Sequence, residues 1–102
     1  MEKLQYFKGK YCDGTTAIQA CNAETGELYA TVSVNLGGYG MKPQNENCIF
    51  IPTYKFEFSD EFVQKIKDDL VKKVIRKVPI GFGEGIEVEL KDNWKEFCED
   101  WA

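Results

Sequence analysis

Histidine is absent from this 102-residue chain, and cysteine and proline are scarce, with four and three residues respectively. Without histidine the chain lacks the usual general base near neutral pH and the commonest metal ligand, so no Ser/His/Asp or Cys/His catalytic site can form. No apolar run approaches the ~20 residues that a membrane span needs. The first residues, MEKLQYFKGKY, also lack the apolar stretch of a signal peptide. We therefore predict a cytoplasmic protein that contacts no membrane and is not an enzyme.

The chain does contain enough apolar surface for a packed core. Its hydrophobic content is 43% and its aromatic content is 14%, which is typical of folded domains and not of disordered chains. A length of 102 residues suits one domain. We predict a single α+β domain that spans residues 1–102.

Turn signals and alternating apolar residues predict strands in the first half of the chain. Asp13-Gly14 is a strong signal for a two-residue hairpin, because glycine accepts the positive φ of such turns. Gly26 suits the left-handed position of a second turn. Residues 28–36 then alternate between apolar and polar side chains, as in a strand with one buried face. The predicted strands lie near residues 3–11, 15–22, 28–36 and 48–51.

A central helix is predicted to begin after Ser59, whose hydroxyl can accept a backbone N–H at the helix N-terminus. Pro79 is well placed to end it. Its buried stripe repeats every four residues and consists of Phe62, Ile66, Leu70 and Val74. Basic side chains would complement the carbonyl end of the helix, namely Lys72, Lys73, Arg76 and Lys77.

A glycine-rich connection, IGFGEG, leads to a final strand at residues 86–90 and a final helix capped by Asp92 or Asn93. The connection lacks the spacing and the Lys-Ser/Thr pair of a phosphate-binding loop. One apolar face of the final helix would carry Trp94, Phe97, Cys98 and Trp101. These tryptophans are predicted core residues, or interface anchors if the helix docks only loosely. The predicted fold is α+β, an antiparallel sheet of four to six strands with one central helix and a C-terminal helix.

The four cysteines match no common disulfide or zinc spacing. Cys12 and Cys21 flank one predicted strand, which would hold them ~20–30 Å apart, whereas a disulfide needs Cα atoms within ~7 Å. Cys12 and Cys48 would lie at the same end of the sheet, so a structural zinc could bind Cys12, Cys48 and Cys98, with Asp13 or water as the fourth ligand. The alternative is that all four are small core residues.

Acidic residues are concentrated at the C-terminus. Residues 84–102 carry two basic and seven acidic side chains, a net charge of −5, while the whole chain carries −4. Such a protein repels phosphate, so direct nucleic-acid binding is not expected. Each carboxylate alone is most simply a solvated residue, but together they could contact a basic partner surface. The candidate partner-binding residues are Glu84, Glu87, Glu89, Glu96, Glu99 and Asp100.

Two stretches of the chain, TTAIQACNAETGELYATVSVNLGGYGMKPQNENCIFI and IRKVPIGFGEGIEVEL, resemble a family of small bacterial domains of unknown function found on phages and conjugative elements. The shared pattern covers roughly residues 15–90. Its parts here are Ala17-Ile18-Gln19, an acidic turn with glycine, Tyr29-Ala30-Thr31 with Val34-Asn35-Leu36, and Val78-Pro79-Ile80-Gly81-Phe82. The family has no catalytic motif to transfer, and this chain departs from it in its cysteines and its acidic, Trp-containing tail.

In size, charge and class the chain is also similar to phage anti-CRISPR proteins that act on type II systems. This resemblance implies an inhibitor, a monomer or homodimer in the bacterial cytoplasm, that binds an RNA-guided DNA nuclease and hinders nucleic-acid loading. Such nucleases hold nucleic acid in a positively charged channel, which an acidic surface could contact. One rival is a self-associating accessory protein of a mobile element that uses the Trp94/Trp101 face. A zinc-dependent enzyme is the last rival.

Overall fold

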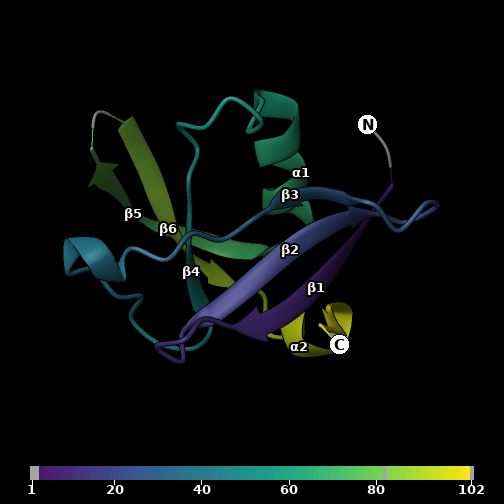
Figure 1. Ribbon diagram of the computed structural model, residues 1–102, viewed down its shortest axis with the longest axis horizontal. Coiled ribbons are helices and arrows are strands. Elements are labelled where there is room, and N and C mark those ends of the chain that lie inside the picture. Colours follow the sequence, from purple (N-terminus) through teal and green to yellow (C-terminus); the bar gives the residue numbers. More distant parts are fainter. Residues whose placement is uncertain (1–2, 82, 102) are drawn as a thin grey trace.

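The computed structural model describes residues 3–81 and 83–101, which contain two β-sheets and two helices of unequal length. Figure 1 shows the sheet formed by the N-terminal strands in front of the sheet formed by the later strands, with the longer helix at the top of the view. None of the helices in these residues is long and apolar enough to cross a bilayer. The elements are β1 (Leu4–Lys10), β2 (Thr16–Asn22), β3 (Leu28–Thr31), the 3-10 turn η1 (Gly37–Tyr39), β4 (Cys48–Ile51), α1 (Asp60–Leu70), β5 (Val71–Ile80), β6 (Gly83–Leu90), α2 (Trp94–Phe97) and β7 (Glu99–Asp100).

Both predicted hairpins of the N-terminal part are present, but the first turn is longer than the predicted two residues, because the Tyr11 amide donates to the Thr15 carbonyl oxygen across Cys12, Asp13 and Gly14. β1 and β2 pair antiparallel across the Asp13-Gly14 turn, in which Gly14 has φ +86°. The Asp13 carboxylate accepts hydrogen bonds from the Thr15 amide at 3.0 Å and hydroxyl at 2.6 Å. The second turn has Gly26 at φ +76°. Local turn chemistry therefore favours both hairpins through residues that are close together in sequence.

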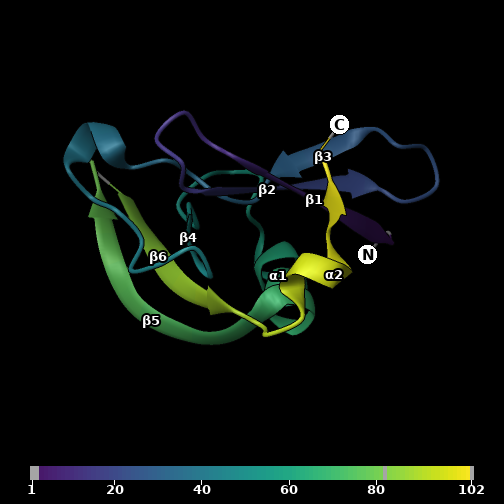
Figure 2. The ribbon, with the colours of Figure 1, turned by 90° about the horizontal axis from the view of Figure 1, so that it is seen from below.

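The two sheets have the strand orders β3-β2-β1-β7 and β4-β6-β5 in the described residues. An isolated antiparallel bridge between Val34, which follows β3, and Phe50 of β4 connects them. Figure 2 shows β5 curving along one side of the molecule while β1, β2 and β3 lie along the other. The fold class is thus α+β, as predicted, but the strands form two sheets and not one.

The core lies between the two sheets and α1. Tyr6 and Ile18 contribute from the first sheet, and both side chains are almost fully buried. From the second sheet and α1 the core receives Ile49, Ile51, Val88, Leu90, Phe62, Ile66 and Leu70. Ser59 caps α1 as predicted, since its hydroxyl accepts a hydrogen bond from the Phe62 amide at 3.2 Å.

The predicted length of the central helix is wrong. α1 ends at Leu70 and the chain continues directly into β5, so Val74 is not part of a helical stripe and is 44% exposed. Four β-branched residues, Val71, Val74, Ile75 and Val78, favour an extended backbone in this segment. Pairing with β6 then satisfies its backbone groups. The basic residues assigned to the helix end, Lys72, Lys73, Arg76 and Lys77, lie on this strand.

The predicted C-terminal helix is only one turn long. α2 ends at Phe97, and the next residues form β7, which pairs in parallel with Phe7 and Lys8 of β1. The single apolar face predicted for this helix is therefore split. Trp94 and Cys98 are buried, whereas Phe97 and Trp101 are 48% and 51% exposed.

Glycines in the IGFGEG segment serve a close approach of strands. β5 and β6 form a hairpin, and Gly81 after β5 has φ +60°; Phe82 of this segment lies outside the described residues. Gly85 is buried beside β4: a Cβ atom built on it would stand 2.7 Å from the Ile51 carbonyl oxygen and 2.7 Å from Ile80 Cδ1. A side chain at this position would push β4 and β6 apart.

Replacing Gly85 with alanine should therefore destabilise the protein by about 1–3 kcal/mol, the usual cost of overpacking. The measurement is the free energy of unfolding in urea. Gly38→Ala is the matched control, because a Cβ atom there has no neighbour within 4 Å. Equal stability of the two variants would contradict the close contact between β4 and β6.

Candidate protein-binding surface

Glu87 is not available to a partner, because its side chain is fully buried. Its carboxylate forms an ion pair with Arg76, whose Nε donates a hydrogen bond at 2.6 Å. It also accepts a hydrogen bond from the backbone amide of Gln44 at 2.9 Å. The prediction of a solvated face is therefore wrong for this residue. The glutamates do alternate with the apolar residues along β6. The face of the strand that carries Glu87 is nevertheless not open to solvent at this position, because Gln44 in the loop before β4 packs against it.

Glu84 and Glu89 lie apart from the C-terminal carboxylates. Glu84 is exposed next to the β5–β6 turn, at the end of the molecule farthest from α2 and β7 (Figure 2). Glu89 is partly buried and its oxygens lie 3.9 Å from Lys72 Nζ and 3.6 Å from Lys73 Nζ. The basic residues of β5 therefore neutralise part of the acidic run seen in the sequence.

The buried position of Glu87 gives a stability prediction. Glu87→Ala leaves the Gln44 amide without its acceptor and the guanidinium of Arg76 without its counter-ion, which should cost about 2–3 kcal/mol of unfolding free energy. Glu89→Ala is the control, since it removes only two long, partly exposed ion pairs, which together should contribute at most about 1 kcal/mol. Urea unfolding of both variants measures the difference. A smaller loss for Glu87→Ala than for Glu89→Ala would contradict this account.

Three predicted residues remain together at the C-terminus. Glu96 is exposed on α2, and Glu99 and Asp100 are exposed on β7. Asp100 lies 3.0 Å from Lys8 Nζ, yet its side chain is 87% exposed. Only one basic side chain in the described residues is therefore within ion-pair distance of these three carboxylates.

Lys8 holds this C-terminal segment in place. Its ammonium group donates hydrogen bonds to the carbonyl oxygens of Lys95 at 2.9 Å and Cys98 at 3.0 Å, and it also forms the ion pair with Asp100. The backbone carbonyl of Lys8 accepts a hydrogen bond from the Trp101 amide at 2.9 Å. These contacts satisfy carbonyl groups at the end of α2 and set the register of β7 against β1.

Two aromatic rings flank the exposed carboxylates. Phe97 packs partly on Tyr6, with ring centroids 5.9 Å apart, and Trp101 lies over Gly9 of β1. Both remain about half exposed. The sequence predicts Trp101 as a core residue, or as an anchor if the final helix docks loosely, and it predicts Phe97 only on the apolar face of that helix. We define the C-terminal surface as Glu96, Phe97, Glu99, Asp100 and Trp101.

The structure places the three predicted zinc ligands in different surroundings. Cys12 is exposed in the β1–β2 turn, whereas Cys48 and Cys98 are buried. Burial raises the pKa of Cys98 to about 11, and burial also raises the pKa of Cys48, whose thiol lies 3.6 Å from Asn45 Oδ1. Residues 3–81 and 83–101 contain no group of three or more Cys, Asp or Glu side chains arranged to hold a metal. Zinc binding stays a prediction.

The cysteine environments predict different reactivities. Because the thiolate is the nucleophile, a raised pKa keeps Cys98 and Cys48 protonated at pH 8, and burial blocks reagents. Iodoacetamide should modify Cys12 first, as measured by mass spectrometry, with Cys98 modified only after unfolding. Early modification of Cys98 in the folded protein would contradict the buried position.

Elemental analysis of the unlabelled protein tests the predicted zinc site. Less than about a tenth of a zinc per chain would reject a structural site.

Comparisons with protein-family models, with curated proteins and with solved structures find no match for this chain. The resemblance to a mobile-element family and to anti-CRISPR proteins therefore stays a prediction. What the molecule does must be argued from its own surfaces.

Proposed function

We propose that this protein is a non-enzymatic inhibitor that binds a bacterial RNA-guided DNA nuclease through the C-terminal surface and hinders nucleic-acid loading. The observation that carries the proposal is the juxtaposition of exposed carboxylates with two half-exposed aromatic rings on one short segment. The resemblance to phage proteins suggests the class of partner. A structural zinc is an optional part of this proposal and is not needed for its binding step.

The charges of the C-terminal surface suit a basic partner. Glu96 lies on α2, and Glu99 and Asp100 lie on β7, the next element. Asp100 forms an ion pair with Lys8, whose side chain is itself mostly buried. Exposed charges of one sign accelerate the encounter with a surface of the opposite sign and orient it. The nucleic-acid channel of an RNA-guided nuclease is such a surface.

The aromatic rings supply what the charges cannot. Side chains of tryptophan and other aromatics bury a large apolar area with few rotatable bonds, and they are enriched among the residues that dominate binding energy. Phe97 and Trp101 are held by α2 and by the pairing of β7 with β1, so little conformational freedom remains to be lost on binding. We therefore assign anchoring to the rings and steering to the carboxylates.

Self-association is the second candidate, favoured by the outer face of the first sheet. Phe7 and Cys21 are partly exposed there, Leu28 is 57% exposed, and Trp101 borders the same hollow as Phe7 and Cys21. An apolar sheet face of this kind could pair with a second copy. Trp94 takes no part in such a contact, because it is buried.

The test is a DNA cleavage assay with purified type II nucleases, each loaded with guide RNA after incubation with the protein. Inhibition should rise with protein concentration and weaken at high salt, because the Debye length falls from ~10 Å at 0.1 M to ~3 Å at 1 M. The double variant Glu96→Lys/Glu99→Lys should raise the half-maximal inhibitory concentration at least about tenfold, since it sets like charges against each other.

The control is Glu24→Lys/Glu27→Lys, which makes the same change in net charge at the exposed β2–β3 turn. It should inhibit like the unaltered protein. Complete cleavage by every nuclease at a large excess of protein would reject the proposed function. A dimer on a sizing column that Leu28→Asp converts to a monomer would then favour the second candidate.

A further inference from the structure

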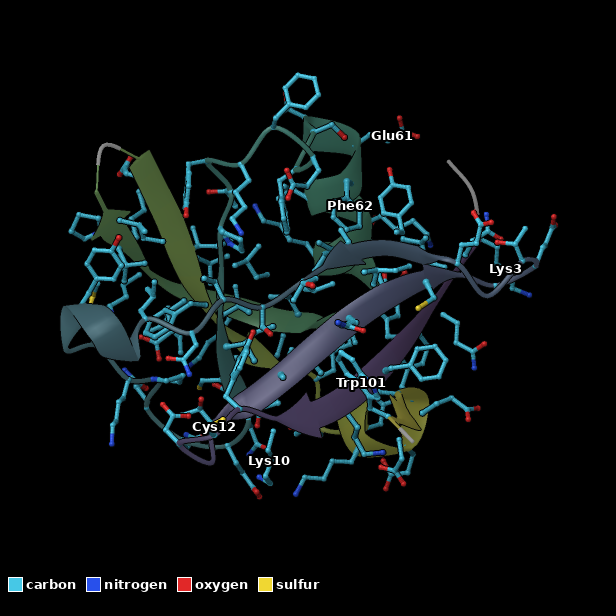
Figure 3. The ribbon with its side chains drawn as sticks, viewed as in Figure 1. Lys3, Lys10, Cys12, Glu61, Phe62 and Trp101 are labelled. Atoms are coloured by element: carbon cyan, nitrogen blue, oxygen red, sulfur yellow. The ribbon has the colours of Figure 1, made fainter. Side chains whose placement is uncertain are left out.

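A hollow of about 360 Å³ lies beside β1, between α2, the loop before β4 and β7. Figure 3 shows Lys10 at the end of β1 and Trp101 beside the same strand. The residues around the hollow are Lys8, Gly9, Lys10, Thr16, Glu46, Trp94, Lys95, Asp100 and Trp101. Its volume falls at the lower end of the range of small-molecule sites, which is ≈ 300–1,000 Å³.

The charge around the hollow is opposite in sign to that of the whole protein. Lys8, Lys10 and Lys95 face Glu46 and Asp100, so three ammonium groups and two carboxylates leave a net charge of +1. The chain as a whole carries −4. The hollow is therefore a place where an anionic group can gain electrostatic energy.

The lysines of the hollow are not equivalent. Lys8 is bound to Asp100 at 3.0 Å, and Lys95 is bound to Glu46 at 2.8 Å. Lys10 is exposed and forms no such ion pair in the described residues. The hydrogen bond and the charge of Lys95, and to a smaller extent the charge of Lys10, lower the pKa of Glu46.

An aromatic ring borders this positive field. Trp101 is 51% exposed and lies over Gly9, where a Cβ atom would stand 3.7 Å from the indole Cε3. Trp94 forms a buried part of the wall, fixed by a hydrogen bond of 2.9 Å from its Nε1 to Asn47 Oδ1. Exposed tryptophan faces stack readily on planar ligands, and such stacking contributes ≈ 1–3 kcal/mol per nucleic-acid base.

We propose that this hollow binds a small planar aromatic molecule that carries an anionic group. The ring stacks on Trp101, and the phosphate or carboxylate lies near Lys10 and Lys95. The shared chemistry is a flat ring joined to an anion, whether the molecule is a nucleoside monophosphate or an aromatic carboxylate. The site overlaps the C-terminal surface at Asp100 and Trp101, whereas Glu96, Phe97 and Glu99 do not line the hollow.

The test uses the full chain without any nuclease and follows the two indole N–H signals by NMR. Adenosine 5′-monophosphate and indole-3-acetate each contain a ring and an anion. Adenosine and ribose 5-phosphate are the half-ligands of the first, and indole and acetate are the half-ligands of the second. At least one of the first two should shift the Trp101 signal saturably and bind at least about fivefold more tightly than either half-ligand, because stacking and charge act together. Binding of either one supports the site, and a difference between them shows which combination of ring and anion the hollow prefers.

Variants distinguish a built site from general attraction. Trp101→Leu should weaken binding at least about fivefold through lost stacking. Lys10→Gln should weaken it about two- to fivefold, the range of an exposed charge pair. Lys77→Gln removes the same charge from β5, outside the hollow, and should leave the affinity within about twofold of the native value.

Circular dichroism checks that each variant is folded. If Trp101→Leu does not fold, the affinity of Lys10→Gln tests the proposed site. The proposal is overturned if neither anion-bearing ring binds, or if a half-ligand binds as tightly as the whole. Equal loss of affinity for Lys10→Gln and Lys77→Gln would also overturn it. Because no nuclease is present, these outcomes leave the proposed inhibition to its own assay.

Discussion

The ammonium group of Lys8 is the contact on which the C-terminal part of this protein depends. It is mostly buried, and it joins two carbonyl groups at the end of α2 to the carboxylate of Asp100 on β7. These contacts satisfy carbonyl groups of α2, a helix of a single turn, and link the strand that follows to β1. The exposure of Phe97 and Trp101, and hence both proposed binding surfaces, follows from that geometry.

Charge is distributed in the folded protein quite differently from its distribution along the chain. The acidic run at residues 84–102 is divided among different environments. Glu84 is exposed beside the β5–β6 turn, Glu87 is buried and paired, Glu89 is partly neutralised on the sheet, and the C-terminal surface is exposed. Conversely, Lys10 and Lys95, which are far apart in sequence, come together beside Trp101. A locally positive hollow in an acidic protein arises only from this folding.

Local signals predicted much of the fold because they act through neighbouring residues. Asp13-Gly14 makes a turn by its own hydrogen bonds, and Ser59 caps α1 through the amide three residues away. The segment after Leu70 was mispredicted because its apolar residues fit both a helical and an extended pattern. Pairing with β6 favours the extended conformation, and the residues of the segment do not by themselves indicate that β6 is its partner.

By itself the sequence determined the α+β class, the two N-terminal hairpins, the beginning of α1 and an acidic, tryptophan-containing C-terminus. Each of these depends on residue types and spacings within a few positions. Only the tertiary structure decided that Glu87 is buried, that Trp94 is covered while Trp101 is exposed, and that Lys10 and Lys95 border the same hollow. The physical reason is that burial and net local charge depend on strands and loops that meet across the whole length of the chain.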